Sequence, residues 1–249
     1  MQSTADNLAA ERASALLATY HGIDGSALLQ PMLTREFAGR IAVVSSFGTE
    51  SALLLALVAE IDPAVPVLFL DTGKHFGETL RHRDRLVQRL GLSDVRSIKP
   101  DPGSLAERDP QGMLWASDAD GCCRIRKTAP LQWAVSGFDA WITGRKRFQG
   151  GLRSELATIE ASDDKIKVNP LATWSRAMIE AGLEVRGLPR HPLEADGFLS
   201  IGCMPCTERV APGADARSGR WAGTDKIECG IHLPRPVLVP AAGLAAAGD

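Results

Sequence analysis

The 249-residue sequence has no long apolar run. None of its stretches reaches the about 18 residues that a membrane-spanning helix needs, so we expect no membrane segment. The first twenty residues carry acidic side chains early and lack a cationic start followed by an apolar stretch. This excludes the usual pattern of a secretory signal, and we expect a cytoplasmic protein.

An excess of positive charge is also missing, because the formal net charge is −2. The sequence therefore gives no general attraction to nucleic acid or to anionic membranes, and we expect neither as a partner. Any anionic ligand must be held by a local group of basic residues. There is also no internal repeat, so a single α/β core is the expected organisation.

Apolar, β-branched runs alternate with helical patterns along most of the chain. The expected strands cover residues 41–46, 66–70, 94–100, 139–144 and 165–170, and the expected helices cover 51–60, 78–90, 128–135 and 173–182. Residues 1–40 are expected to be helical, and 100–121 to form a loop rich in Pro, Asp and Gly. This alternation predicts an α/β fold with a doubly wound, mostly parallel sheet.

Three polar loops follow expected strands, where ligands bind in such sheets. The loop SSFGTES places the hydroxyls of Ser45 and Ser46 and the small Gly48 before a helix, whose amides can hold a phosphate. A plain turn capped by Ser or Thr is the competing interpretation. No Gly-Lys-Ser/Thr follows, so this is not a Walker loop. LDTGK and the basic turn GRKRFQGGLR end two further strands, and the second is a candidate anion site.

Four of the five cysteines form two pairs about 80 residues apart. Cys122 and Cys123 are adjacent, and Cys203 and Cys206 form a C-x-x-C. Both members of the first pair can face one site only in a turn or at a helix start, and on that helix Lys127 would share the face of Cys123. The spacing favours an iron–sulfur cluster, with structural zinc and a redox dithiol as alternatives.

Cys229 remains outside both pairs, in the polar segment KIECGIH. An incidental buried cysteine is the simpler interpretation. The segment is polar and lies near the Pro-, Ala- and Gly-rich end of the sequence, so burial is not expected there. An unpaired thiol with Arg217, Arg220 and Lys226 nearby in sequence is a candidate nucleophile.

These elements together resemble the adenylyl-sulfate and phosphoadenylyl-sulfate reductase family. The resemblance covers about residues 38–233 and rests on the ordered motifs SSFGTES, LDTGKHFGETL, CCRIRK, WITGRKRFQGG, KVNPL, LPRHPL, GFLSIGCMPCT, GRW and ECGIH. It implies an adenine nucleotide alpha hydrolase-like fold of the pyrophosphate-loop type. The expected parts are an N-terminal helical segment (1–37), a nucleotide-binding domain with the cluster site (38–210) and a tail that carries the nucleophile (211–249).

The two cysteine pairs resemble those of the family's cluster-containing branch, which implies a [4Fe–4S] cluster and adenylyl sulfate as substrate. Cys229 matches the catalytic cysteine. The residues that match substrate-binding positions are Ser45, Ser46, Gly48, Lys127, Gly144, Arg217 and Arg220. The implied reaction yields sulfite and AMP through an S-sulfocysteine, which a separate thioredoxin resolves. A homo-oligomer is compatible with these features.

Two other functions compete with this one. A sulfur-transferring tRNA-modifying enzyme would also combine a pyrophosphate loop with a cysteine-bound cluster, but SSFGTES lacks the usual Lys-Asp-Ser. A non-catalytic, nucleotide-binding redox sensor would not need Cys229. Within the resembling family, the 3′-phosphorylated nucleotide is the alternative substrate.

Overall fold

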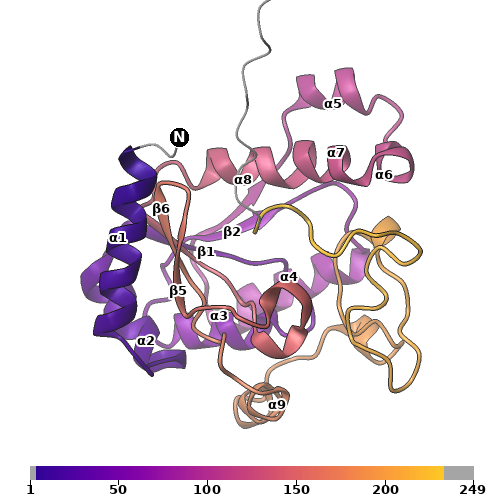
Figure 1. Ribbon diagram of the computed structural model, residues 1–249. Coiled ribbons are helices and arrows are strands. Elements are labelled where there is room, and N and C mark those ends of the chain that lie inside the picture. The colour runs from indigo at the N-terminus through magenta and orange to yellow at the C-terminus, as the bar shows by residue number, and fades with distance from the viewer. Residues whose placement is uncertain (1–3, 233–249) are drawn as a thin grey trace, which may run out of the picture.

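The computed structural model describes residues 4–232, which contain one six-stranded sheet with the order β3-β2-β1-β4-β6-β5 (Figure 1). The strands are β1 (Ile41–Val44), β2 (Val67–Leu70), β3 (Val95–Ile98), β4 (Ala140–Ile142), β5 (Ile159–Ser162) and β6 (Lys165–Val168). All neighbouring strands are parallel except β5 and β6, which are antiparallel. The predicted mostly parallel sheet is confirmed.

The strand β5 was not predicted from the sequence. Its four residues, IEAS, include two polar side chains and lack a continuous apolar run. A two-residue turn at Asp163–Asp164 joins β5 to β6, and the helix α1 (Thr4–Thr19) packs against β5. An edge strand that is covered on one side needs fewer apolar residues than the central strands, which helices cover on both faces.

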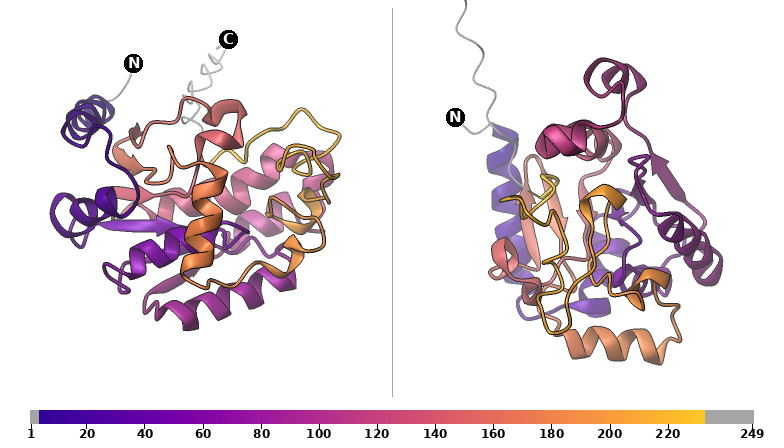
Figure 2. Two further views of the ribbon diagram at one scale, coloured as in Figure 1. Left: turned by 90° about the horizontal axis from the view of Figure 1, so that it is seen from below. Right: turned by 90° about the vertical axis from the view of Figure 1, so that its right-hand side faces the viewer.

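Helices cover both faces of the sheet, and neighbouring residues of one strand separate the two layers. Val43 belongs to the larger apolar core, and Ala42, on the opposite face, belongs to the smaller one. The larger core includes residues of α2 (Gly25–Pro31), α3 (Ser51–Ala59), α4 (Gly77–Leu90) and α9 (Arg176–Val185). The smaller core is covered by α8 (Ala129–Ala134), and Figure 2 shows α9 and the run leading to α8 on opposite sides of the sheet.

The expected loop at 100–121 is wrong, because it contains α5 (Pro102–Arg108) and α6 (Leu114–Ser117). Asp101 caps α5 by accepting a hydrogen bond from the amide of Ser104 at 2.7 Å, and Pro102 occupies the first turn. These are ordinary signals for a helix start, which the high content of Pro, Asp and Gly concealed.

The order of the strands fixes the place of a ligand site. From β1 the chain moves outward to β2 and β3, and then returns to add β4 on the other side of β1. The carboxyl ends of β1 and β4 therefore flank the point at which the strand order reverses, where open α/β sheets bind ligands. No helix within residues 4–232 is both long enough and apolar enough to cross a bilayer.

Candidate active site

The loop after β1 is held in an unusual backbone conformation. Phe47 has a positive φ of 50°, which non-glycine residues rarely adopt. Its amide donates to the Ser45 hydroxyl at 3.1 Å, and its ring packs edge to face on Phe69 at 5.6 Å. A Cβ on Gly48 would lie 3.3 Å from the carbonyl oxygen of Ile201, so the loop packs closely against the segment before Cys203.

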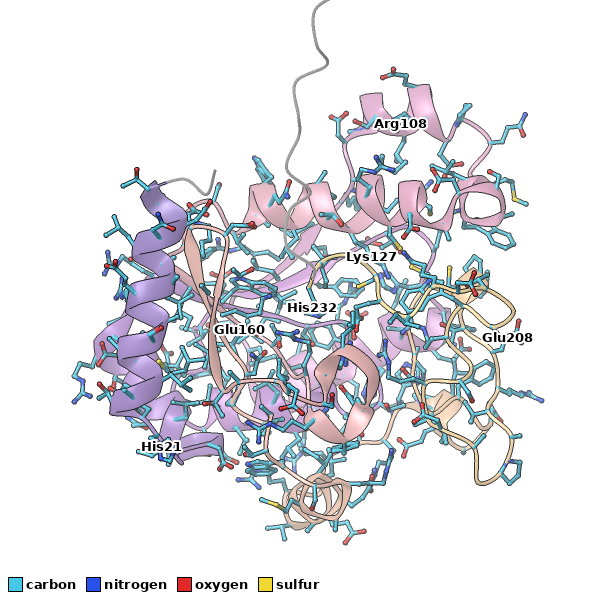
Figure 3. All side chains as sticks on the ribbon, viewed as in Figure 1. His21, Arg108, Lys127, Glu160, Glu208 and His232 are labelled. Atoms are coloured by element: carbon cyan, nitrogen blue, oxygen red, sulfur yellow. The ribbon has the colours of Figure 1, made fainter. Side chains whose placement is uncertain are left out.

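A pocket lies at the carboxyl ends of β1 and β4. Its lining includes every residue that the sequence predicted for substrate binding or nucleophilic attack: Ser45, Ser46, Gly48, Lys127, Gly144, Arg217, Arg220 and Cys229. Figure 3 shows Lys127 and His232, which also line it, in the middle of the molecule. The structure thus brings together residues from Ser45 to Cys229, which are spread over 185 positions of sequence. The roles of these residues stay predictions.

Lys127 lies on the π-helical turn η2 (Arg124–Thr128), which continues α7 (Ala119–Cys123) into α8. π-Helical turns inside α-helices occur often at functional sites. Burial would lower the pKa of Lys127, but the neighbouring cysteines, Cys203 foremost, raise it above its ordinary value. Lys127 is therefore charged, and it lines the pocket close to Cys203, Cys229 and Cys123.

The two arginines of the segment 217–220 are oriented by backbone groups. Arg217 donates to the carbonyl of Ile227 at 3.0 Å, and Arg220 donates to the carbonyl of Cys206 at 3.3 Å. The guanidinium of Arg220 also lies 4.4 Å from the ring centroid of Trp221. A Cβ on Gly202 would lie 2.3 Å from that guanidinium, so only glycine leaves room for it.

Most cations of the basic turn 144–153 already have partners inside the protein. Arg145 pairs with Glu160, and Lys146 pairs with Glu50 at 2.5 Å. These acids neutralise charges that the sequence suggested for anion binding. The turn is therefore mainly a structural element at the edge of the pocket.

The segment around Cys229 is folded over the pocket and is not an exposed tail. Arg153 holds Glu228, the residue before Cys229, and both side chains are buried. Ile231 packs against the smaller apolar core, and the ring of His232 stacks on Trp141 with centroids 5.9 Å apart. Cys229 itself is half-buried, whereas the sequence had suggested an exposed position.

The pair of Arg153 and Glu228 was not predicted, because no local pattern links residues 75 positions apart. Burial would raise the pKa of Glu228, but Arg153 and Arg217 hold it below its ordinary value. Burial, with Arg145 and Lys167 nearby, lowers the pKa of His232 well below its usual range. The residues beside Cys229 are thus an anionic carboxylate and a neutral imidazole.

Cys122 and Cys123 are the last two residues of the short helix α7, near the beginning of the helical run that continues through η2 and α8. The sequence predicted them in a turn or at a helix start. Asp118 caps this helix by accepting from the amide of Gly121 at 2.7 Å. A Cβ on Gly121 would lie 2.2 Å from the Asp118 carboxylate, so the cap and a larger residue cannot coexist there.

In the second pair, Cys206 ends the turn η6 (Met204–Cys206) and Cys203 directly precedes it, and this segment is fixed to the loop after β2. The Met204 amide donates to the carbonyl of Lys74 at 2.7 Å. The Thr72 hydroxyl lies 3.3 Å from the sulfur of Cys203. These contacts come from the loop LDTGK that the sequence singled out, so this loop holds the second cysteine pair in place.

The donor set fits an iron–sulfur cluster. All four cysteines are free thiols, and only Cys206 is more than slightly exposed. Burial raises the pKa of Cys123 to about 12, so its proton must be displaced by a metal for it to become a ligand. No three His, Cys, Asp or Glu within 4–232 surround one ion position. A cubane does not require this, because each of its irons takes one thiolate.

The family described as the phosphoadenosine phosphosulfate reductase domain matches residues 40–209. The chain belongs to this reductase family. An adenosine 5′-phosphosulfate reductase of Mesorhizobium japonicum is 49% identical over 229 residues, which cover 92% of this chain and 90% of that protein. An enzyme of the same name from a Chelativorans species is 53% identical over 196 residues, or 79% and 80% of the two chains.

A solved structure supports the fold of the family member described here. The crystal structure of a phosphoadenylyl-sulfate reductase from Candida auris, in a phosphate complex, superposes with a TM-score of 0.65 and 23% identity. The match covers 80% of this chain and 97% of that one. The likeness confirms the predicted α/β architecture. The predicted boundaries after 37 and after 210 stay predictions, and residues 233–249 of the expected tail lie outside the described residues.

Proposed function

We propose that this chain reduces adenylyl sulfate to sulfite and AMP, with Cys229 as the nucleophile and thioredoxin as the reductant. The observation that carries the proposal is the presence of Cys229 in one pocket with Lys127, Arg217 and Arg220. A thiol beside three cations, at the nucleotide-binding edge of an α/β sheet, suits attack on an anionic nucleotide. The names of the two relatives at 49% and 53% identity support the same substrate.

In the first step, the Cys229 thiolate attacks the sulfur of adenylyl sulfate. A bond forms between the two sulfur atoms, the bond from sulfur to the bridging phosphate oxygen breaks, and AMP leaves with that electron pair. Lys127, Arg217 and Arg220 offset the charge that develops on the oxygens. The loop 45–48 holds the phosphate through its amides and hydroxyls.

In the second step, a thiolate of thioredoxin attacks the sulfur of Cys229. Sulfite leaves with the electron pair of the broken sulfur–sulfur bond, and a mixed disulfide remains. The second thiol of thioredoxin attacks this disulfide and releases Cys229. The two electrons gained by the substrate sulfur thus come from the thioredoxin dithiol, which is oxidised.

Cys122, Cys123, Cys203 and Cys206 are the proposed ligands of a [4Fe–4S] cluster. Such a cluster would supply fixed charge beside Lys127 and join the two cysteine segments, while the thiol steps account for both electrons. Structural zinc is the alternative for the same four residues.

Anaerobically purified protein tests the function directly. Mixed with adenylyl sulfate and no thioredoxin, it should release one equivalent of AMP and carry a sulfo group on Cys229, detectable by peptide mass spectrometry. Adding thioredoxin should release sulfite. Cys229→Ser should retain the metal and nucleotide binding but lose turnover, because a serine hydroxyl without a base is a poor nucleophile.

Ala222→Ser is the matched control, because Ala222 is exposed in the same segment. It should turn over like the unmodified protein. A sulfo group on Cys203 or Cys206, or full activity of Cys229→Ser, would contradict the proposed role of Cys229. A larger kcat/KM for the 3′-phosphorylated nucleotide than for adenylyl sulfate would instead identify the 3′-phosphorylated nucleotide as the substrate.

A further inference from the structure

The segment that carries Cys229 is fastened to the helix of the first cysteine pair by one ion pair. The ammonium of Lys226, three residues before Cys229, contacts the carboxylate of Asp120, two residues before Cys122. The two ends differ in environment: the Lys226 side chain is 8% exposed, whereas the Asp120 side chain is 79% exposed. The pair therefore reaches from the interior to the surface.

The position of Lys226 is set by a short turn that begins at Trp221. The Thr224 hydroxyl donates to the Trp221 carbonyl at 2.8 Å and accepts from the Lys226 amide at 3.3 Å. The Lys226 ammonium lies 5.5 Å from the centroid of the Trp221 ring. Trp221 is itself fixed, because its amide donates to the Cys206 carbonyl at 3.2 Å. The turn and the Trp221 ring thus hold Lys226 where it contacts Asp120.

We infer that the pair of Lys226 and Asp120 positions Cys229 for attack on the bound nucleotide and opens when the protein dithiol reduces the sulfo intermediate. Both are positioning residues, because neither lines the pocket. The inference rests on the proposed function, in which Cys229 must first face a small pocket and then be reached by another protein. A half-buried thiol held in one conformation can attack the nucleotide in the pocket, but the dithiol of a second protein cannot easily reach it.

The exposure of Asp120 makes this pair suitable for opening. An ion pair with one exposed partner contributes little net stability, since water solvates the released carboxylate. By contrast, the pair of Glu228 and Arg153 on the other side of Cys229 is buried at both ends, and water does not replace its contacts as readily. Release therefore begins at Lys226.

The test separates the two half-reactions in the anaerobic, metal-loaded enzyme. Asp120→Lys should slow AMP release in a single turnover without thioredoxin by roughly three- to tenfold, the range expected for a lost and reversed exposed pair. Sulfite release by thioredoxin from the preformed S-sulfo enzyme should stay at the wild-type rate or increase. The double variant Asp120→Lys/Lys226→Asp should recover AMP release relative to Asp120→Lys.

Glu107→Lys is the matched control, because it makes the same charge change at an exposed position of α5. It should leave both rates unchanged. AMP release by Asp120→Lys at the wild-type rate, or no recovery in the double variant at equal iron content, would overturn the inference. A wild-type enzyme that forms no sulfo adduct would instead overturn the proposed function.

Discussion

Arg153 donates three hydrogen bonds to the carboxylate of Glu228, at 2.8 to 3.0 Å, and Glu228 directly precedes Cys229. Arg153 belongs to the turn η4 (Gly151–Arg153) that follows β4. The buried pair therefore joins the edge of the sheet to the segment of the nucleophile. Because both side chains are buried, removing the charge of one partner leaves the other buried without a counter-charge.

Glu228→Gln should weaken this connection without changing the size of the side chain. The amide keeps one acceptor oxygen but leaves Arg153 without a counter-charge, and breaking a buried pair costs about 3 kcal/mol. We expect a lower free energy of unfolding by that amount and a clear fall in kcat/KM, measured by denaturant titration and sulfite release. Glu208→Gln, at an exposed position, is the control, and equal effects of the two variants would contradict the role of Glu228.

Gly202→Ala should displace Arg220 from the pocket. The added methyl group would lie 2.3 Å from the guanidinium, and the flexible side chain of Arg220 must move away. We expect KM for adenylyl sulfate to increase roughly tenfold, the effect of losing one charge-assisted contact, with little change in Tm. Gly137→Ala is the control, since nothing lies within 4 Å of its Cβ. An unchanged KM would show that Arg220 does not bind the substrate.

Cys203→Ala should remove the metal and loosen the segment 187–210. The proposed cluster joins this segment to the first cysteine pair, and metal binding is coupled to folding. Iron and sulfide analysis should find both lost, and hydrogen exchange should increase over 187–210. Cys229→Ser should keep both iron and protection. If anaerobically prepared protein contained zinc but no iron or sulfide, the four cysteines would form a zinc site and the proposed cluster would be wrong.

A buried pair of histidines should make the protein sensitive to acid. His82 and His191 are each 1% exposed with ring centroids 5.0 Å apart, and burial lowers the pKa of each to about 4. The unfolded chain takes up these protons near pH 6.5, so stability is lost as the pH falls from about 6.5 toward 4. Each ring contributes at most about 3 kcal/mol to this loss.

His82→Leu should reduce this acid-dependent loss by about half. It should not destabilise the protein at pH 7, because neither ring nitrogen of His82 has a hydrogen-bond partner among the described residues. Thermal unfolding between pH 7 and pH 4.5 measures both effects. His21→Gln, at an exposed position, is the control. An unchanged pH profile for His82→Leu would refute the assignment.

The sequence predicted the parts of the site whose signals are local. The run from Ile41 to Ser46 changes from apolar to polar where β1 ends, and this change predicted the position of the polar loop that lines the pocket. The order of parallel strands then places the loops after β1 and β4 together. The sequence did not reveal that Phe47 adopts the left-handed backbone conformation that glycine adopts most easily.

The parts that the sequence did not predict depend on contacts between distant segments. Nothing near Arg153 indicates that Glu228 takes its charge, and nothing near Arg145 indicates Glu160 as a partner. The half-buried position of Cys229 was missed for the same reason, because it depends on Ile231 packing against the far side of the sheet. Burial of a polar segment is decided by tertiary partners that its own residues do not reveal.

The cap of the helix that carries Cys122 and Cys123 limits the size of the residue at position 121. Gly121 has no positive φ, so a larger residue would not strain its backbone; the space is taken by the carboxylate of Asp118. Alanine at 121 is acceptable only where position 118 has lost its acid, and an acid at 118 requires glycine at 121. The two positions should therefore covary among related chains, and an alignment should show them changing together rather than one at a time.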